Sequence, residues 1–361
     1  MENQPLNFIQ GYAAMEFELA LARKTNDIVA FTALPGTGKS AMMACIPEWG
    51  PDVLPPDVNP DELPVGWKPE VHTIYVPQHE DIEFHMPVID QKTGKYGLEP
   101  SPLLTRLTLG CYQVFDEWTM DGCQRMMLQM CSGTRISCGP WLGPRGVSRV
   151  LIGNTADSGN FSFIDNSVLG NRLRQYEWVP LFDEWLTRFA LPYGVHPIIA
   201  TAVKMEGQSL FLDWDSARTR NSTPRSLTIA SDTMIAAEEY TGGTLSDSQR
   251  MTVLAGSLHD EAALKIQSLF HLHDKIVPFT AIVQAPDTAP IPEEAAAMFM
   301  TCANVSRRTS PDEWSQVMGY VNRLPLELRG SIVEPVIKNW PVLESTTEFQ
   351  RYQVDTAPLV V

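Results

Sequence analysis

The first half of the chain alternates between short apolar runs and segments whose apolar residues recur at helical spacing. The short runs are rich in β-branched and aromatic residues, and we expect them to be buried strands at 28–32, 71–76, 112–117 and 147–152. Helical spacing predicts helices at 8–23, 42–49 and 121–131 and the tail of a helix at 103–109. This alternation from residue 26 to about 179 predicts a three-layer α/β domain on a mainly parallel sheet.

Two segments interrupt this alternation. Six prolines fall between residues 50 and 69, which is too many for a regular element, so we expect an irregular surface insertion there. Residues 84–98 hold two short apolar runs on either side of Lys92 and Lys95, which predicts a hairpin or a protruding loop.

The second half of the chain has a different character and is predicted to be mainly helical. Helices are expected at 182–190, 197–204, 225–240, 246–272, 292–305, 311–322 and 326–339. The proline-rich stretch 277–292 is the best candidate for a boundary inside this half. We therefore expect three parts, at 1–179, 180–276 and 277–361.

Composition narrows the class of protein. The chain has 361 residues, 44% of them hydrophobic, enough to bury a full core in each part. Its net charge of −16 opposes non-specific binding to nucleic acid. The net charge does not exclude a local cluster of basic residues that lines a pore. No apolar run reaches membrane-spanning length and no signal core follows the first residues, so we expect a cytoplasmic protein. The six cysteines form no C-x-x-C pair, which indicates reduced thiols and no zinc site.

The segment 28–41 carries the strongest chemical signal, because a predicted strand runs into a glycine-rich turn and then a helix. Its turn fits the phosphate-binding pattern G-x-x-x-x-G-K-[ST], except that Ala33 stands at the first glycine. We expect Lys39 to reach the β- and γ-phosphates and the Ser40 hydroxyl to hold Mg²⁺. A chance glycine turn is disfavoured by the strand before it and the helix after it. The predicted nucleotide contacts are Pro35, Gly36, Thr37, Gly38, Lys39, Ser40 and Ala41.

Polar residues end two of the other predicted strands. In an open α/β sheet the ligand sits at the carboxyl ends of the strands, so these positions are functional candidates. We expect Asp116 to hold Mg²⁺, Glu117 to polarise an attacking water, and Asn154 to orient that water or touch the γ-phosphate. A solvated strand end is the alternative for Asp116 and Glu117, and the phosphate loop in the same domain argues against it.

Hydrolysis of a nucleoside triphosphate also needs positive charge where the transition state gathers negative charge. Arg172 and Arg174 are expected at the end of a helix, and Arg225 at the start of a helix in the second half. Arg172 and Arg225 are the preferred candidates, with Arg172 serving the nucleotide of a neighbouring subunit and Arg225 closing onto the nucleotide.

Taken in order, these motifs resemble the AAA+ ATPases, most closely the MoxR-like branch and especially versions carried by bacteriophages. In the terms of that family they are Walker A, Walker B, sensor 1, the arginine finger and sensor 2, at 35–40, 115–117, 153–154, 171–172 and 223–225 respectively. Two departures are the Ala33 already noted and a sensor 1 strand that ends Gly-Asn-Thr rather than Asn-Pro.

The resemblance implies an α/β P-loop core, a helical lid at 180–276 and a mainly α-helical C-terminal extension. It also implies an enzyme that uses ATP and Mg²⁺ in an oligomeric ring, commonly a hexamer, to remodel or assemble a protein partner. That partner often contains a von Willebrand factor A domain. The implied location is the cytoplasm of a bacterium, or of a bacterial host if a phage encodes the chain.

Two other functions stay open from the sequence. A nucleic-acid motor or helicase loader would need a basic pore, for which Lys92 and Lys95 are the only local support. An ATP-gated structural ring would bind ATP without hydrolysing it, and the intact Asp116–Glu117 pair argues against this.

Overall fold

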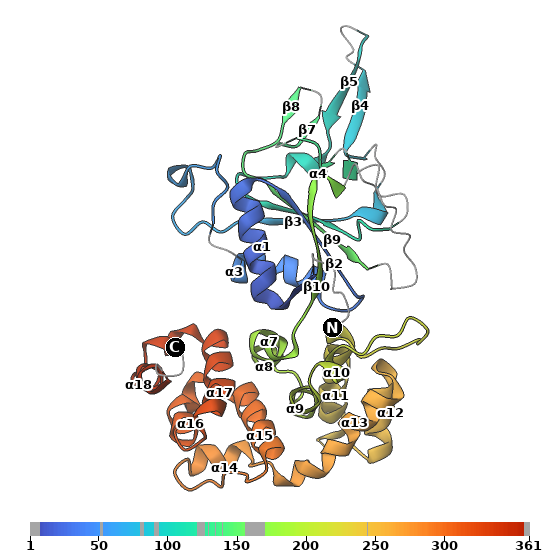
Figure 1. The fold of residues 1–361 in the computed structure, drawn as a ribbon. Coiled ribbons are helices and arrows are strands. Elements are labelled where there is room, and N and C mark those ends of the chain that lie inside the picture. The colour runs from blue at the N-terminus through green and yellow to red at the C-terminus, as the bar shows by residue number, and fades with distance from the viewer. Residues whose placement is uncertain are drawn as a thin grey trace. The chain divides into compact units, whose positions relative to one another are not determined.

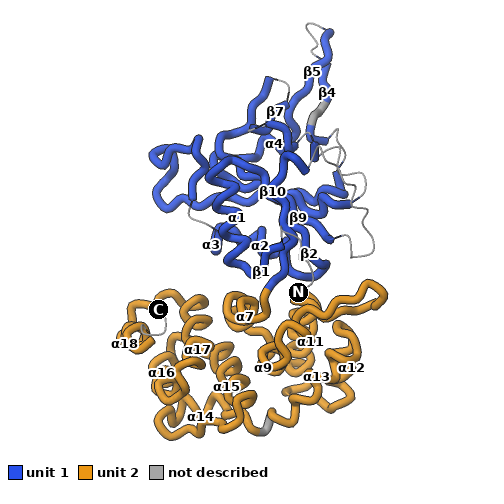
Figure 2. The backbone as a smooth tube through the Cα atoms, viewed as in Figure 1, with its two compact units in different colours: residues 1–180 blue, residues 181–361 orange. Residues whose placement is uncertain are grey.

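The computed structural model describes residues 8–50, 53–79, 83–89, 94–120, 127–128, 130–133, 135–138, 140–155, 170–243 and 245–356. The chain divides into two compact units, residues 1–180 and residues 181–361 (Figure 2), and each is described by itself below. In the described ranges no helix combines the length and the apolar composition that a membrane span requires. The division into three parts, with a boundary at 277, stays a prediction.

A six-stranded sheet, parallel throughout, forms the centre of the first unit (Figure 1). Its spatial order is β1-β10-β2-β9-β6-β3. The middle strands β2, β9 and β6 are buried along their whole length, which explains why they read as apolar runs in the sequence. The strands are β1 (Phe8–Gln10), β2 (Ile28–Ala33), β3 (Val71–Tyr75), β6 (Tyr112–Asp116), β9 (Ser148–Asn154) and β10 (Leu173–Val179).

Helical segments cover both faces of this sheet. On one face lies α1 (Gly11–Thr25), where the ring of Tyr12 meets Trp178 edge-on at 5.6 Å and the Trp178 indole N–H donates to the Gly11 carbonyl at 2.8 Å. On the other face Ile28 and other strand residues pack in one apolar cluster with α4 (Pro102–Thr105) and with Met127, Met130, Cys131, Ile136 and Cys138. The expected three-layer α/β class is therefore confirmed.

The connections between the strands follow the expected plan. The strand β2 leads through the glycine-rich loop into α2 (Lys39–Ala44) and α3 (Ile46–Trp49), and the insertion after them is irregular apart from the short turn η1 (Pro60–Glu62). After β3 come the turn η2 (Val76–Gln78) and an antiparallel hairpin. The hairpin strands are β4 (His85–Ile89) and β5 (Tyr96–Pro100), and a second small ribbon pairs β7 (Ser137–Cys138) with β8 (Trp141–Leu142).

The second unit is mainly helical, as expected. Its longest helix, α11 (Pro224–Thr241), corresponds to the helix predicted at 225–240, and α17 (Leu326–Asn339) has the predicted bounds. The other elements are α7 (Phe182–Trp185), a π-helical turn (Leu186–Ala190), α8 (Leu191–Tyr193), α9 (Pro197–Glu206), α10 (Gln208–Phe211), α12 (Asp247–Ser257), α13 (Asp260–Ser268), η6 (Leu269–Lys275), α14 (Phe279–Gln284), α15 (Ala295–Arg308), η7 (Pro311–Glu313), α16 (Trp314–Val321), η8 (Pro341–Ser345) and α18 (Thr347–Thr356).

Several elements differ from the prediction. Phe8–Gln10 is a strand and not the first turn of a helix, because these residues pair with the far end of β10. The strand β10 was not predicted at all, and α14 lies inside the proline-rich stretch that was expected to be a boundary. Residues 121–126 and 129 of the expected helix at 121–131, and Lys92 of the hairpin, lie outside the described residues. Met127 and Met130 are buried in the core.

The described cysteines are free thiols. Cys45 is exposed, whereas the other four are buried, and burial raises the pKa of Cys131 and of Cys302 to about 12. The buried thiols are therefore protonated and unreactive near neutral pH.

Candidate functional site

The glycine-rich loop leaves β2 at its carboxyl end and returns directly into α2. Gly36 and Gly38 have φ angles of +79° and +94°, a backbone conformation that side chains beyond glycine rarely adopt. The Thr37 hydroxyl donates to the Leu34 carbonyl at 2.9 Å and closes the loop on itself. Within the described residues no side chain caps α2, and the backbone N–H groups of a helix's first turn are of the kind that binds an anion.

Ala33, which replaces the first glycine of the motif, is the last residue of β2 and is buried in the sheet. It pairs in register with Asn154. Because it has an ordinary strand conformation, this position does not need the freedom of glycine. The departure from the motif is therefore compatible with the turn that follows.

The ammonium group of Lys39 lies at the centre of the site and is buried. It donates to the carbonyls of Ala33 and Leu34 at 3.2 and 3.1 Å and to the side-chain oxygen of Asn154 at 2.9 Å. These acceptors are neutral, and a phosphate oxygen would be a stronger, charge-assisted partner for the same group. Lys39 is thus poised at the loop that would hold the phosphates.

Asn154 joins this lysine to Glu117. While its side-chain oxygen accepts from Lys39, its side-chain nitrogen donates to Glu117 Oε2 at 2.8 Å. Asn154 ends β9, Glu117 directly follows β6 and Lys39 begins the helix after β2, yet the three residues form one chain of hydrogen bonds. Glu117 itself has a φ of +60°, a left-handed conformation that costs about 1 kcal/mol in a residue other than glycine. Such backbone strain is typical of functional positions.

Asp116 is the last residue of β6 and is only 8% exposed. Among the described residues its Oδ1 atom has no hydrogen-bond partner. A buried, unpaired carboxylate oxygen is unfavourable unless a cation satisfies it. The residue therefore fits the magnesium ligand expected there, and Ser40, in the first turn of α2, supplies a hydroxyl of the right kind.

Asn154 has one further contact, with Thr119, that the sequence does not predict. The backbone N–H of Asn154 donates to the hydroxyl of Thr119 at 3.2 Å. Thr119 lies in the turn after Glu117 and is buried. Its sequence signal is slight, since a threonine two residues after an acidic pair has many structural uses.

The two arginines near residue 172 have different surroundings. Arg174 was expected at a helix end, but it is the second residue of β10. There it donates to Glu18 at 2.7 Å and to the Tyr176 hydroxyl at 3.1 Å. This ion pair joins β10 to α1, and the hydrogen bond with Glu18 raises the pKa of Arg174. Arg172 is exposed and precedes the strand, with one long contact to the Leu128 carbonyl at 3.5 Å.

Arg172 lies at the edge of the sheet opposite to Lys39. The strand β10 begins at Leu173, which pairs with Ile28 at the start of β2, whereas Lys39 follows the end of β2. The length of β2 separates these two edges by about 16 Å. Arg172 therefore does not belong to the group of residues around the phosphate loop of its own chain.

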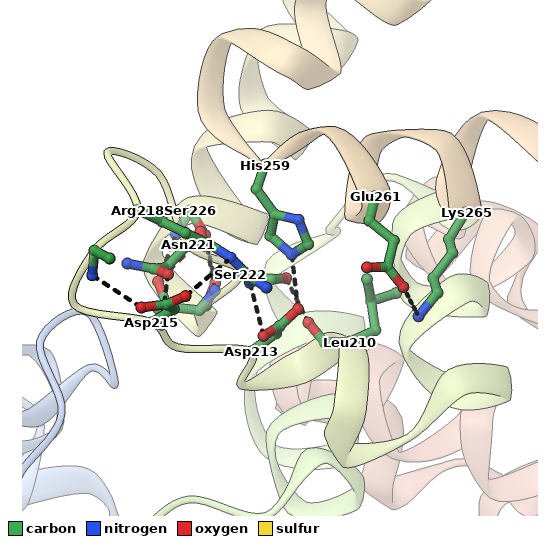
Figure 3. Close-up of polar contacts among 12 residues, drawn as sticks. Leu210, Asp213, Asp215, Arg218, Asn221, Ser222, Ser226, His259, Glu261 and Lys265 are labelled. Atoms are coloured by element: carbon green, nitrogen blue, oxygen red, sulfur yellow. Dashed lines mark hydrogen bonds and ion pairs between the residues drawn. The ribbon is translucent and has the colours of Figure 1, made fainter.

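Arg225 belongs to the second unit, where it is exposed near the start of α11. Thr223 and Ser226 form a capping box that fixes this helix start. The preceding loop is closed by the bridge between Asp213 and Ser222. Figure 3 shows how Arg218 and His259 hold Asp213, at 2.9 Å each. The backbone at Arg225 is thus held in place by contacts within its own unit.

The structure therefore brings Lys39, Asn154 and Glu117 into one hydrogen-bonded chain, with Asp116 beside Glu117 in the sequence. The loop residues 35–38 lie between β2 and α2, and Ser40 and Ala41 lie in the first turn of α2. This arrangement offers a cradle for phosphate, a ligand for a hard cation, and a carboxylate that is oriented by an amide.

Comparisons with known proteins add similarities of fold. No protein-family model matches this chain, and no curated protein matches it. Similar solved structures include a point mutant of RuvB from Thermotoga maritima, 15% identical, which covers 76% of this chain and 75% of that chain with a TM-score of 0.34. NtrX from Brucella abortus, solved in complex with ADP, is 11% identical and covers 96% of this chain and 68% of that chain with a TM-score of 0.32. The functional argument therefore rests on the residues of this chain.

The unpaired carboxylate of Asp116 leads to a prediction about stability. Asp116→Asn removes a buried charge, so it should raise the free energy of unfolding by about 1 kcal/mol in the absence of nucleotide and metal. Chemical denaturation in EDTA measures this, with Asp61→Asn at an exposed position as the matched control that changes little. A clear loss of stability in Asp116→Asn would show that the carboxylate is well satisfied in the folded chain.

Proposed function

We propose that this protein is an ATP hydrolase of the AAA+ class that acts as an oligomer. The observation that carries the proposal is the chain of hydrogen bonds from Lys39 through Asn154 to Glu117, at the edge of the sheet where the phosphate loop begins. The bridge brings together a lysine that can stabilise phosphate charge and a carboxylate that can activate water, two groups that hydrolysis of a phosphoanhydride uses.

Each residue of the first unit has a proposed role. The loop residues Pro35 to Gly38 and the first amides of α2, at Lys39, Ser40 and Ala41, cradle the phosphates of ATP. Lys39 exchanges its carbonyl partners for phosphate oxygens. Glu117 accepts the proton of the attacking water, and Asn154 orients that water while it holds the carboxylate in place.

The magnesium ion that accompanies ATP would be held by Ser40 and Asp116. When bound, it neutralises charge on the phosphates. The unpaired Oδ1 atom of Asp116 is the feature of this chain that favours such a site.

An oligomer is proposed because Arg172 lies at the far edge of the sheet from its own phosphate loop. In a ring, that edge can face the nucleotide of the next subunit, where Arg172 would stabilise the charge of the transition state. Arg174 is unsuited to this role, since it is engaged by Glu18. Arg225 of the second unit is proposed to close onto the γ-phosphate, which makes that unit, at least to residue 276, a lid.

The finer assignment follows the resemblance of the motifs. We assign the chain to the MoxR-like branch in its phage-type form, with a hexamer as the ring and a location in the cytoplasm of a bacterium or of a phage's bacterial host. The client is proposed to be a protein, and a protein with a von Willebrand factor A domain is one candidate.

A protein client is favoured over nucleic acid by charge and by the β4–β5 hairpin. The chain carries a net charge of −16, which repels a phosphate backbone. Opposite residues of the hairpin share a face, and Ile89, Tyr96 and Leu98 are exposed there, with Tyr96 82% exposed. Exposed apolar side chains suit a protein partner better than a nucleic-acid backbone.

Replacing the proposed base tests the chemistry. Glu117→Gln keeps an oxygen that can accept from Asn154 but removes the proton acceptor, so turnover of ATP should fall by at least about 100-fold. The affinity for ATP should stay within about threefold, because the phosphate loop is untouched. Turnover and nucleotide binding are measured side by side, with Glu99→Gln on the exposed hairpin as the control. Near-normal turnover in Glu117→Gln would remove Glu117 from this role, and an inactive wild type that binds ATP would favour a structural ring.

Mixing two inactive variants tests the role of Arg172 between subunits. Arg172→Ala leaves its own Lys39, Glu117 and Asn154 intact, and Glu117→Gln still supplies Arg172 to a neighbour. Each variant alone should lose at least about 100-fold in turnover. Their mixture should recover a substantial part of the wild-type rate, because some mixed interfaces combine an intact base with an intact arginine. A mixture as inactive as its components would place Arg172 outside the neighbour's site.

A further inference from the structure

We propose that Thr119 is a positioning residue for the hydrolytic step, acting through the backbone of Asn154 on the chain that joins Lys39 to Glu117. This inference rests on the proposed function. Thr119 is 3% exposed, and neither its position in the sequence nor the phosphate-loop motif singles it out.

The hydroxyl of Thr119 takes the place of a missing strand partner. The strand β6 ends at Asp116, which is paired with Ile152, whereas β9 continues to Asn154. Beyond Asp116 the left-handed conformation of Glu117 turns the chain out of the sheet. Trp118 still donates its N–H to the Ile152 carbonyl at 3.4 Å. The next group of β9 on this side, the Asn154 N–H, would then lack a carbonyl acceptor from β6, and Thr119 Oγ1 accepts from it at 3.2 Å.

Gly153 makes this contact possible. A Cβ atom at residue 153 would lie 2.6 Å from Thr119 Cγ2 and 2.7 Å from Thr119 Oγ1, far inside contact distance. Only glycine therefore lets Thr119 approach β9 closely enough to accept from Asn154. Gly153 and Thr119 therefore depend on each other for this contact, although 34 positions of sequence separate them.

The backbone of Asn154 is consequently held on both sides. On the side of β2, the neighbouring Thr155 N–H donates to the Ala33 carbonyl at 3.2 Å, and on the side of β6 Thr119 accepts from Asn154 itself. The side chain of Asn154 must reach Lys39 Nζ at 2.9 Å and Glu117 Oε2 at 2.8 Å at the same time. The side chain can make both hydrogen bonds only if the Cα atom of Asn154 is displaced little. Small misplacements of catalytic groups reduce rates strongly.

The test compares the isosteric Thr119→Val, which removes the hydroxyl, with Thr119→Ser, which keeps it. We expect Thr119→Val to lower kcat for ATP by about tenfold or more with KM and nucleotide affinity within about twofold, because the phosphate loop is unchanged. Thr119→Ser should restore kcat to within about threefold of the wild type. Thr119→Ala removes the same hydroxyl without adding a methyl group there, and it replaces Thr119→Val in the comparison if the valine variant does not fold.

A second comparison separates positioning from general loss of stability. In an Asn154→Ala background, Thr119→Val should lower kcat by less than about twofold further, since Thr119 acts through Asn154. An unchanged kcat in Thr119→Val, or a loss that simply multiplies with that of Asn154→Ala, overturns the inference while an active wild type leaves the proposed function standing. A wild type that does not hydrolyse ATP overturns both.

Discussion

The parallel pairing of β2, β9 and β6 is the constraint on which the site depends. Because the three strands run in one direction, the phosphate loop, Asn154 and the pair Asp116–Glu117 all emerge at the same edge of the sheet. The register places Asn154 opposite Ala33, directly before the loop. A slip of one residue would put Gly153 or Thr155 there instead, and the bridge between Lys39 and Glu117 would be lost.

This edge of the sheet holds several groups that are unfavourable for folding. Asp116 is buried with an unpaired oxygen, Glu117 has a left-handed backbone, and the ammonium of Lys39 is buried. Strands that are apolar on both faces can sustain such costs, because the core beneath them supplies the stabilisation. In the proposed function a phosphate and a cation would bind these groups, so the same residues that are costly for folding would be the ones that hold the ligand.

The local part of this arrangement could be predicted from the sequence, and the tertiary part could not. The strand, loop and helix from residue 28 were predictable because glycine spacing and the lysine report on local backbone and chemistry. The sequence does not predict β10, because Arg172 and Arg174 suggest the end of a helix there, whereas in the structure Arg174 lies in a strand and pairs with Glu18 on α1. The role of Thr119 depends on a contact with Asn154, which local pattern cannot show.

If the site works as proposed, the protein hydrolyses ATP and needs its neighbours to do so. The most direct measurement is Mg²⁺-dependent ATP turnover over a series of protein concentrations, paired with the mass of the particle with and without ATP. We expect turnover per subunit to rise as ATP drives assembly. A protein that stays monomeric and hydrolyses ATP at a rate per subunit independent of concentration would contradict the ring, and a protein without turnover at any concentration would contradict the enzyme.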